Sequence, residues 1–142
     1  QKNKILGSIG VKEAALKWFK QAKHDLSMAE KNITIDGYDV ASFLAHQAVE
    51  KLLKAIIVFE GKTPPRSHYL DEVAKLLGLS DETMENIAEL SGDYMISRYP
   101  DVTGRVPYEE YDSATAEEKV NAARKIFEQL KHRYSSMETT DE

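Results

Sequence analysis

The chain has 142 residues, of which 42% are apolar, 30% are charged and none is cysteine. A chain of this length can bury one sizeable core, so we expect a single domain that needs no disulfide or structural metal to fold. The lack of cysteine excludes a disulfide scaffold, a thiolate metal site and a cysteine nucleophile. The net charge is -5 at pH 7, so no overall positive field attracts nucleic acid or an anionic membrane. Any contact with nucleic acid must therefore be local.

The first half of the chain predicts two long helices. Apolar residues recur at steps of three and four and predict a helix over about 11–33. Asp36-Gly37 then marks a break, after which Asp39 can cap a second helix by accepting free backbone N–H groups. The apolar positions of this second helix run without interruption over 41–57.

No targeting or membrane segment is predicted. The densest apolar stretch, 41–59, carries Glu50, Lys51 and Lys54, which a bilayer-spanning helix would not hold without special cause. The first ten residues contain no hydrophobic signal region and no small-residue cleavage site. We therefore expect a cytoplasmic protein.

Three further helices are predicted in the second half. Ser67 is a candidate cap for a short helix that ends at Gly78, where a left-handed residue is tolerated. Ser80 opens the next helix, which should end near Ser97. A capping box that starts at Thr115 predicts the start of the last helix. The predicted fold class is all-α, an up-and-down bundle of four to five helices.

The expected domain organisation has three parts. Residues 1–10 form an N-terminal segment, residues 11–134 form the helical bundle, and residues 135–142 form an acidic tail that should fray.

A long connection separates the fourth predicted helix from the last one. It covers about 18 residues, 97–114, and loops of this length inside a compact domain are usually functional or disordered. Rings and guanidinium groups can stack on bases and pair with phosphates, although tyrosines can equally pin the loop to the bundle. The residues concerned are Tyr94, Tyr99, Tyr108, Tyr111, Arg98 and Arg105.

The second helix also carries a run of polar residues. By their spacing these residues lie opposite the apolar stripe of the helix, and they are His46, Gln47, Glu50, Lys51 and Lys54. They form either a solvated face or a polar strip that lines a partner surface or a cleft.

Common catalytic motifs are missing from the sequence. It holds neither a phosphate-binding P-loop nor a hydrolase nucleophile elbow. The four histidines include no pair at the spacing of a zinc-binding helix, so we expect no metal and no cofactor. Ser67, His68 and Asp71 are close in sequence, but a helix cap and a first-turn acid explain them more simply than a catalytic triad does.

Three segments resemble the motifs of a known family. The segment Ala45-His-Gln-Ala-Val-Glu-Lys-Leu-Leu-Lys-Ala55 resembles the signature helix of HEPN domains, the higher eukaryote and prokaryote nucleotide-binding family. Pro65-Arg-Ser-His68-Tyr-Leu70 and Ser97-Arg-Tyr-Pro-Asp101 resemble two further motifs of that family. The resemblance extends over about residues 11–134.

The resemblance implies a helical bundle that is often a homodimer and often has a minimal nucleotidyltransferase as its partner. In many such toxin–antitoxin pairs the HEPN member is a metal-independent ribonuclease, in which four to six residues separate an arginine from the histidine that follows it. None of the five arginines of this chain is followed by a histidine at that spacing. A general base for the ribose 2′-OH is then unassigned, unless the fold brings His68 to Arg98.

The leading hypothesis is a non-catalytic HEPN module that binds nucleotide, RNA or a nucleotidyltransferase partner. Its expected contact residues are Arg98, Tyr99, Arg66, His68 and Arg105. One alternative is a metal-independent ribonuclease that uses Arg98 with His68. Another is a purely structural partner protein with nothing bound in the loop.

Overall fold

The structure is a computed structural model that describes residues 2–91 and 106–141. Its α-helices are α1 (Lys2–Thr34), α2 (Tyr38–Phe59), α3 (Leu70–Ala74), α4 (Asp81–Leu90) and α7 (Ser113–Asp141). Two short 3₁₀-helices, η1 (Lys75–Leu77) and η2 (Pro107–Glu110), complete the elements. The described ranges contain no strand, and the predicted all-α fold class is confirmed.

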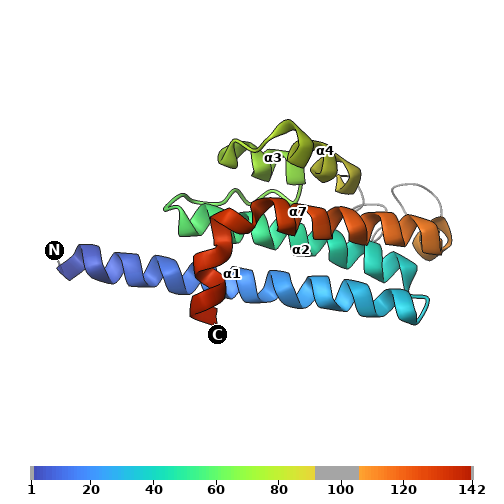
Figure 1. The fold of residues 1–142 in the computed structure, drawn as a ribbon, viewed down its shortest axis with the longest axis horizontal. Coiled ribbons are helices and arrows are strands. Elements are labelled where there is room, and N and C mark those ends of the chain that lie inside the picture. Colours follow the sequence, from blue (N-terminus) through green and yellow to red (C-terminus); the bar gives the residue numbers. More distant parts are fainter. Residues whose placement is uncertain (1, 92–105, 142) are drawn as a thin grey trace.

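Two long helices and α7 build the body of the bundle. α1 and α2 form an antiparallel hairpin with the most extensive interface of the molecule, and α7 lies along both of them (Figure 1). The short helices α3 and α4 pack on α2 and α7 respectively and on each other. Figure 1 shows that α7 bends near its end, so that its last turns cross α1.

The core lies where the predicted apolar stripes meet. Phe19 of α1, Leu52 and Ile56 of α2, Ile87 of α4 and Ile126 of α7 are all fully buried. Because α2 packs against α1, α3, α7 and η2, it is the most deeply enclosed helix. Because α2 is enclosed in this way, several of its polar residues are buried as well.

The turn between α1 and α2 is closed by backbone groups. Asp36 adopts a left-handed φ of 61°, and the Gly37 N–H donates to the Asn32 carbonyl at 2.8 Å. Gly37 is the N-cap of α2 and makes no side-chain capping bond, so the prediction that Asp39 caps this helix is wrong. Asp39 instead lies in the first turn, where its negative charge interacts favourably with the positive end of the helix dipole.

The cap of α3 also differs from the prediction. Tyr69, not Ser67, is the N-cap residue, and it makes no side-chain capping bond. The Ser67 hydroxyl accepts from the Tyr69 N–H at 3.0 Å and donates to Glu72 at 2.6 Å. Ser67 therefore shapes the turn before the helix. The predicted left-handed end at Gly78 is confirmed, with φ at 59°.

Ser80 caps α4 as predicted, since its hydroxyl accepts from the Thr83 N–H at 3.2 Å. α4 ends at Leu90, earlier than the expected end near Ser97, because the backbone of Ser91 is already extended. Serine and the glycine that follows it in the sequence are poor helix formers.

Both ends of α7 differ from the prediction. The helix starts at Ser113, and the Asp112 carboxylate accepts from the Thr115 N–H at 2.8 Å, so Asp112 rather than Thr115 caps it. This hydrogen bond holds the pKa of Asp112 below its ordinary value. The helix also continues past residue 134 to Asp141, because Met137 is buried against the bundle.

One arginine of α7 joins three segments of the chain. Arg133 of α7 forms a two-pronged ion pair with Glu60, at 2.7 and 2.9 Å, just after α2. Its third nitrogen donates to the Leu77 carbonyl of η1 at 2.7 Å. The guanidinium group thus fixes α7 to the connection that follows α2 and to η1.

Candidate functional site

A stripe of polar residues runs through the interior along α2. His46, Glu50 and Lys54 are spaced four residues apart and are only 1%, 3% and 5% exposed. Of the two alternatives, the solvated face is therefore wrong for these three residues. Gln47 and Lys51 are half-buried. The reason is that α2 has packing partners on several sides, which could not be seen from its own periodicity.

Glu50 is the centre of this stripe. Its carboxylate accepts from the Lys54 ammonium at 3.0 Å, one helical turn away. The Nδ1 atom of His68, in the connection between α2 and α3, lies 3.1 and 3.2 Å from the two carboxylate oxygens. A buried carboxylate is costly unless charged and hydrogen-bonding groups satisfy it, and these two partners do so.

α1 supports the polar residues of α2 from the other side. The Lys54 ammonium lies 5.6 Å from the centre of the Trp18 ring, in a cation–π arrangement. Lys51 forms an ion pair with Asp25 at 2.7 Å, and Asp25 also accepts from Gln21 at 2.9 Å. Lys51 is therefore tied to α1.

Burial keeps His46 neutral at neutral pH. Desolvation lowers its pKa from 6.5 to about 4, and the nearby charge of His68 acts in the same direction. The charge of Glu50 and a hydrogen bond to the His68 backbone act in the opposite direction and are weaker.

The polar stripe reaches the surface at His68. The side chain of His68 is 52% exposed, and the neighbouring Arg66 is exposed as well. A carboxylate on Nδ1 favours the tautomer that carries its proton there, which makes Nε2 the basic nitrogen. Such an imidazole can donate to a phosphate when protonated or accept a proton when neutral.

Two of the predicted contact residues lie within the described residues. Arg66 and His68 lie two positions apart in the connection between α2 and α3. Arg98, Tyr99 and Arg105 lie outside the described residues. Of the other tyrosines of the predicted loop, Tyr111 is buried and Tyr108 is exposed, and Tyr94 also lies outside the described ranges.

The residues of α1 that support the site were not predicted from the sequence. Trp18 and Asp25 contact Lys54 and Lys51, respectively. The sequence carried no signal for these contacts, because the four-residue spacing of His46, Glu50 and Lys54 fits an exposed face as well as a buried one.

The described residues hold neither a cluster of metal ligands nor a helix that could span a membrane. No group of three or more His, Asp or Glu side chains in this part of the chain could hold a metal ion. Within the same residues, no helix combines the length and the apolar character that crossing a bilayer requires.

The order of the helices and the motif residues on α2 define a small all-α bundle of a known class. The HEPN domain model matches residues 15–133, and the chain belongs to the HEPN domain family. The predicted family is thus confirmed.

Two solved structures are similar over most of their length. TT1696 from Thermus thermophilus is 27% identical, with a TM-score of 0.77 over 84% of this chain and 97% of that one. ST0689, described as an archaeal HEPN homologue, is 31% identical, with a TM-score of 0.71 over 87% of this chain and 97% of that one. No functionally curated protein matches the chain.

Proposed function

We propose that this protein is a HEPN module that binds nucleotide or RNA through the connection between α2 and α3, without cleaving it. The observation that carries the proposal is the placement of His68, half-exposed near Arg66 in the chain and held from within by the buried Glu50. A side chain that a buried carboxylate orients loses less entropy on binding a ligand.

The chemistry of these side chains suits a phosphate. The guanidinium group of Arg66 can form two parallel hydrogen bonds to phosphate oxygens, and His68 can add a third. Arg98, Tyr99 and Arg105 complete the proposed contacts, with the ring of Tyr99 stacking on a base. We further propose that the module is a homodimer in the cytoplasm and pairs with a minimal nucleotidyltransferase, as the family resemblance implies.

One observation favours a second candidate, a metal-independent ribonuclease. A histidine bound to a carboxylate has the arrangement of an oriented general base. His68 would take the proton of the ribose 2′-OH, and Arg98 would stabilise the charge that grows on the phosphate.

Incubation of the purified protein with a mixed RNA pool in EDTA separates the two candidates. For the binding module we expect retention of intact RNA, with affinity reduced about tenfold or more in Arg66→Ala and in His68→Ala, because each loses a charge-assisted hydrogen bond. Lys125→Ala removes an exposed charge of α7 and should bind RNA like the wild type.

The outcomes are distinct. Cleavage that disappears in both His68→Ala and Arg98→Ala would establish the ribonuclease and refute the non-catalytic proposal. RNA affinity that is unchanged in Arg66→Ala and His68→Ala would refute this binding surface. Light scattering with and without a candidate nucleotidyltransferase tests the assembly, and a monomer at tens of micromolar would refute the homodimer.

A further inference from the structure

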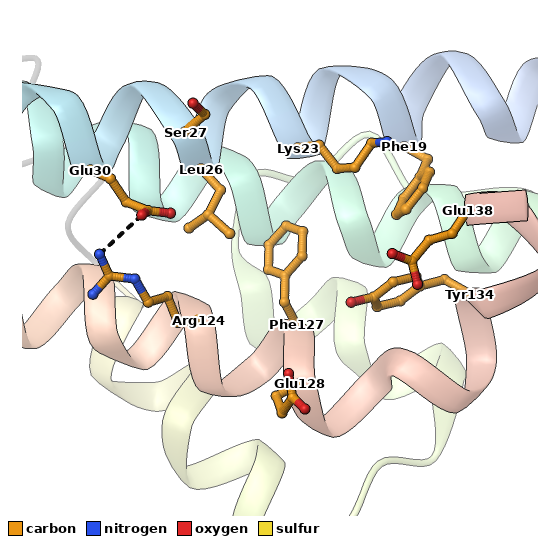
Figure 2. A pocket seen from close by; sticks show the side chains of 10 residues that line it. All are labelled: Phe19, Lys23, Leu26, Ser27, Glu30, Arg124, Phe127, Glu128, Tyr134 and Glu138. Carbon is orange, nitrogen blue, oxygen red and sulfur yellow. Dashed lines mark ion pairs between the residues drawn. The ribbon is translucent and has the colours of Figure 1, made fainter. Parts of the chain in front are cut away.

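A cavity of about 410 Å³ lies between α1 and α7 (Figure 2). Residues from both helices line it, and neither Arg66 nor His68 is among the described lining residues. The volume suits a small organic molecule better than a bare metal ion.

Aromatic rings form one wall of the cavity. The rings of Phe19 and Tyr134 lie 5.1 Å apart at a tilt of 42°, and Phe127 meets Tyr134 edge-on at 6.3 Å. In Figure 2 the Phe127 ring points from α7 toward α1, between Leu26 and Tyr134. Packing among the rings holds this wall in place, so it is formed before any ligand arrives.

The charged residues that line the cavity carry a small excess of negative charge. Among the described residues that line it, three are glutamates and two are basic, and one glutamate, Glu30, is paired with Arg124 at 3.1 Å. Glu128 and Glu138 remain on the side of Tyr134. Burial raises the pKa of Tyr134 to about 12, and the charges of these two glutamates add to the effect.

A cation already lies against the aromatic wall. The ammonium group of Lys23 is 4.9 Å from the centre of the Phe19 ring. This distance is within the range of a cation–π interaction, and the face of an aromatic ring attracts positive charge. Tyr134, in contrast, lies near the carboxylates of Glu128 and Glu138.

We propose that this cavity binds a small organic cation of the alkylammonium or quaternary ammonium class. The cation lies against Phe127 and Tyr134, and Glu128 and Glu138 supply the counter-charge. Free phosphate and nucleotides are disfavoured there by the two carboxylates. The inference is independent of the RNA-binding proposal, because it uses different residues and a ligand of opposite charge.

Choline and its neutral isostere 3,3-dimethyl-1-butanol test the proposal directly. The two molecules have nearly the same shape, so the difference in their affinity measures the effect of the charge. Titration of the full chain, followed by ligand-observed NMR, should show choline binding about tenfold more tightly than the alcohol. Inorganic phosphate should not compete with choline.

Substitutions then locate the site. Glu128→Gln combined with Glu138→Gln should weaken choline binding severalfold, since the counter-charge is lost. Lys23→Met should strengthen it, because the ammonium group beside the Phe19 ring no longer repels the ligand. Glu117→Gln, an exposed residue of α7 outside the cavity, is the matched control and should have no effect.

Equal affinity for choline and the alcohol would overturn the proposal, because the cavity would then be merely apolar. Choline binding that is unaffected by the Glu128→Gln and Glu138→Gln pair would also overturn it. If choline fails to bind and the same pair changes the molecular mass in light scattering, the cavity is a self-association surface instead. Both glutamates have accessible surface, so circular dichroism should show that the pair is folded.

Discussion

At the scale of single residues, the buried histidine of α2 sets the response of the protein to acid. His46 is surrounded by protein and close to Glu50 and to the backbone of His68. Its pKa in the folded state is about 4, whereas an unfolded chain has the ordinary value of 6.5. The unfolded state therefore binds the proton more readily, and folding becomes less favourable as the pH falls below 6.5.

We expect His46 to lower the free energy of unfolding by about 3 kcal/mol between pH 7 and pH 4, with little further loss below the folded-state pKa. Urea unfolding at several pH values measures this dependence, and His46→Asn should flatten it. His132 is exposed on α7, so His132→Asn serves as the control and should leave the dependence unchanged. An unaltered slope in His46→Asn would contradict the expectation.

The charged residues of the same helix show the limit of a prediction from residue type alone. Glu50 and Lys54 are usually exposed residues, and their spacing fits a surface ion pair as well as a buried one. Their burial depends on the connection that carries His68 and on Trp18 of α1, which are distant in sequence.

At the scale of the elements, Gly78 illustrates a position where backbone conformation decides the residue. It ends η1 with φ at 59°, a value that residues with a β-carbon rarely adopt, although a β-carbon would meet no neighbouring atom. The effect of a substitution there is thus conformational and not steric.

Gly78→Ala should lower the free energy of unfolding by about 1–2 kcal/mol, the cost of the left-handed conformation for an alanine. The matched control is Gly10→Ala, within α1, where a β-carbon also meets open space but the backbone is helical. This control should not destabilise the protein, because alanine favours a helix. Equal urea midpoints for the two variants would contradict the argument.

The helices themselves were largely predictable, and their ends were less so. Periodicity identified α1, α2 and α7, because one apolar face of each must meet the core. The caps at Ser67 and Thr115 were assigned wrongly: α3 begins at Tyr69 without a side-chain cap, and at the start of α7 Asp112 accepts the Thr115 N–H. Several residues near each helix start were possible caps. Only the backbone angles select among such candidates.

At the scale of the whole molecule, the end of α7 belongs to the bundle. The sequence 135–142 is polar and predicted a frayed tail, but the bend of α7 brings Met137 against the rest of the protein, where it is 1% exposed. Leu16 of α1 and Phe59 of α2 line the same small hollow as Met137. Met137 follows Tyr134 by three residues and thus extends the apolar stripe of α7, a signal that the polar composition of 135–142 outweighed in the prediction.

Met137→Ala should reduce the free energy of unfolding by about 2–5 kcal/mol, as expected for a fully buried methionine. The midpoint of urea unfolding should fall, with an unchanged slope. Lys131→Ala, on an exposed position of the same helix, should change stability by less than about 0.5 kcal/mol. A stability loss in Met137→Ala as small as that of the control would show that the last turns do not contribute.

The ion pair made by Arg133 bears on the order in which the chain folds. The α1–α2 hairpin joins neighbouring segments through a tight turn, so it can form rapidly and as soon as both helices have been synthesised. Arg133, in contrast, bonds to groups 73 and 56 residues earlier in the chain. These hydrogen bonds can form only after α7 has been synthesised, so we expect α7 to be the last of the three long helices to cover the apolar side of the hairpin.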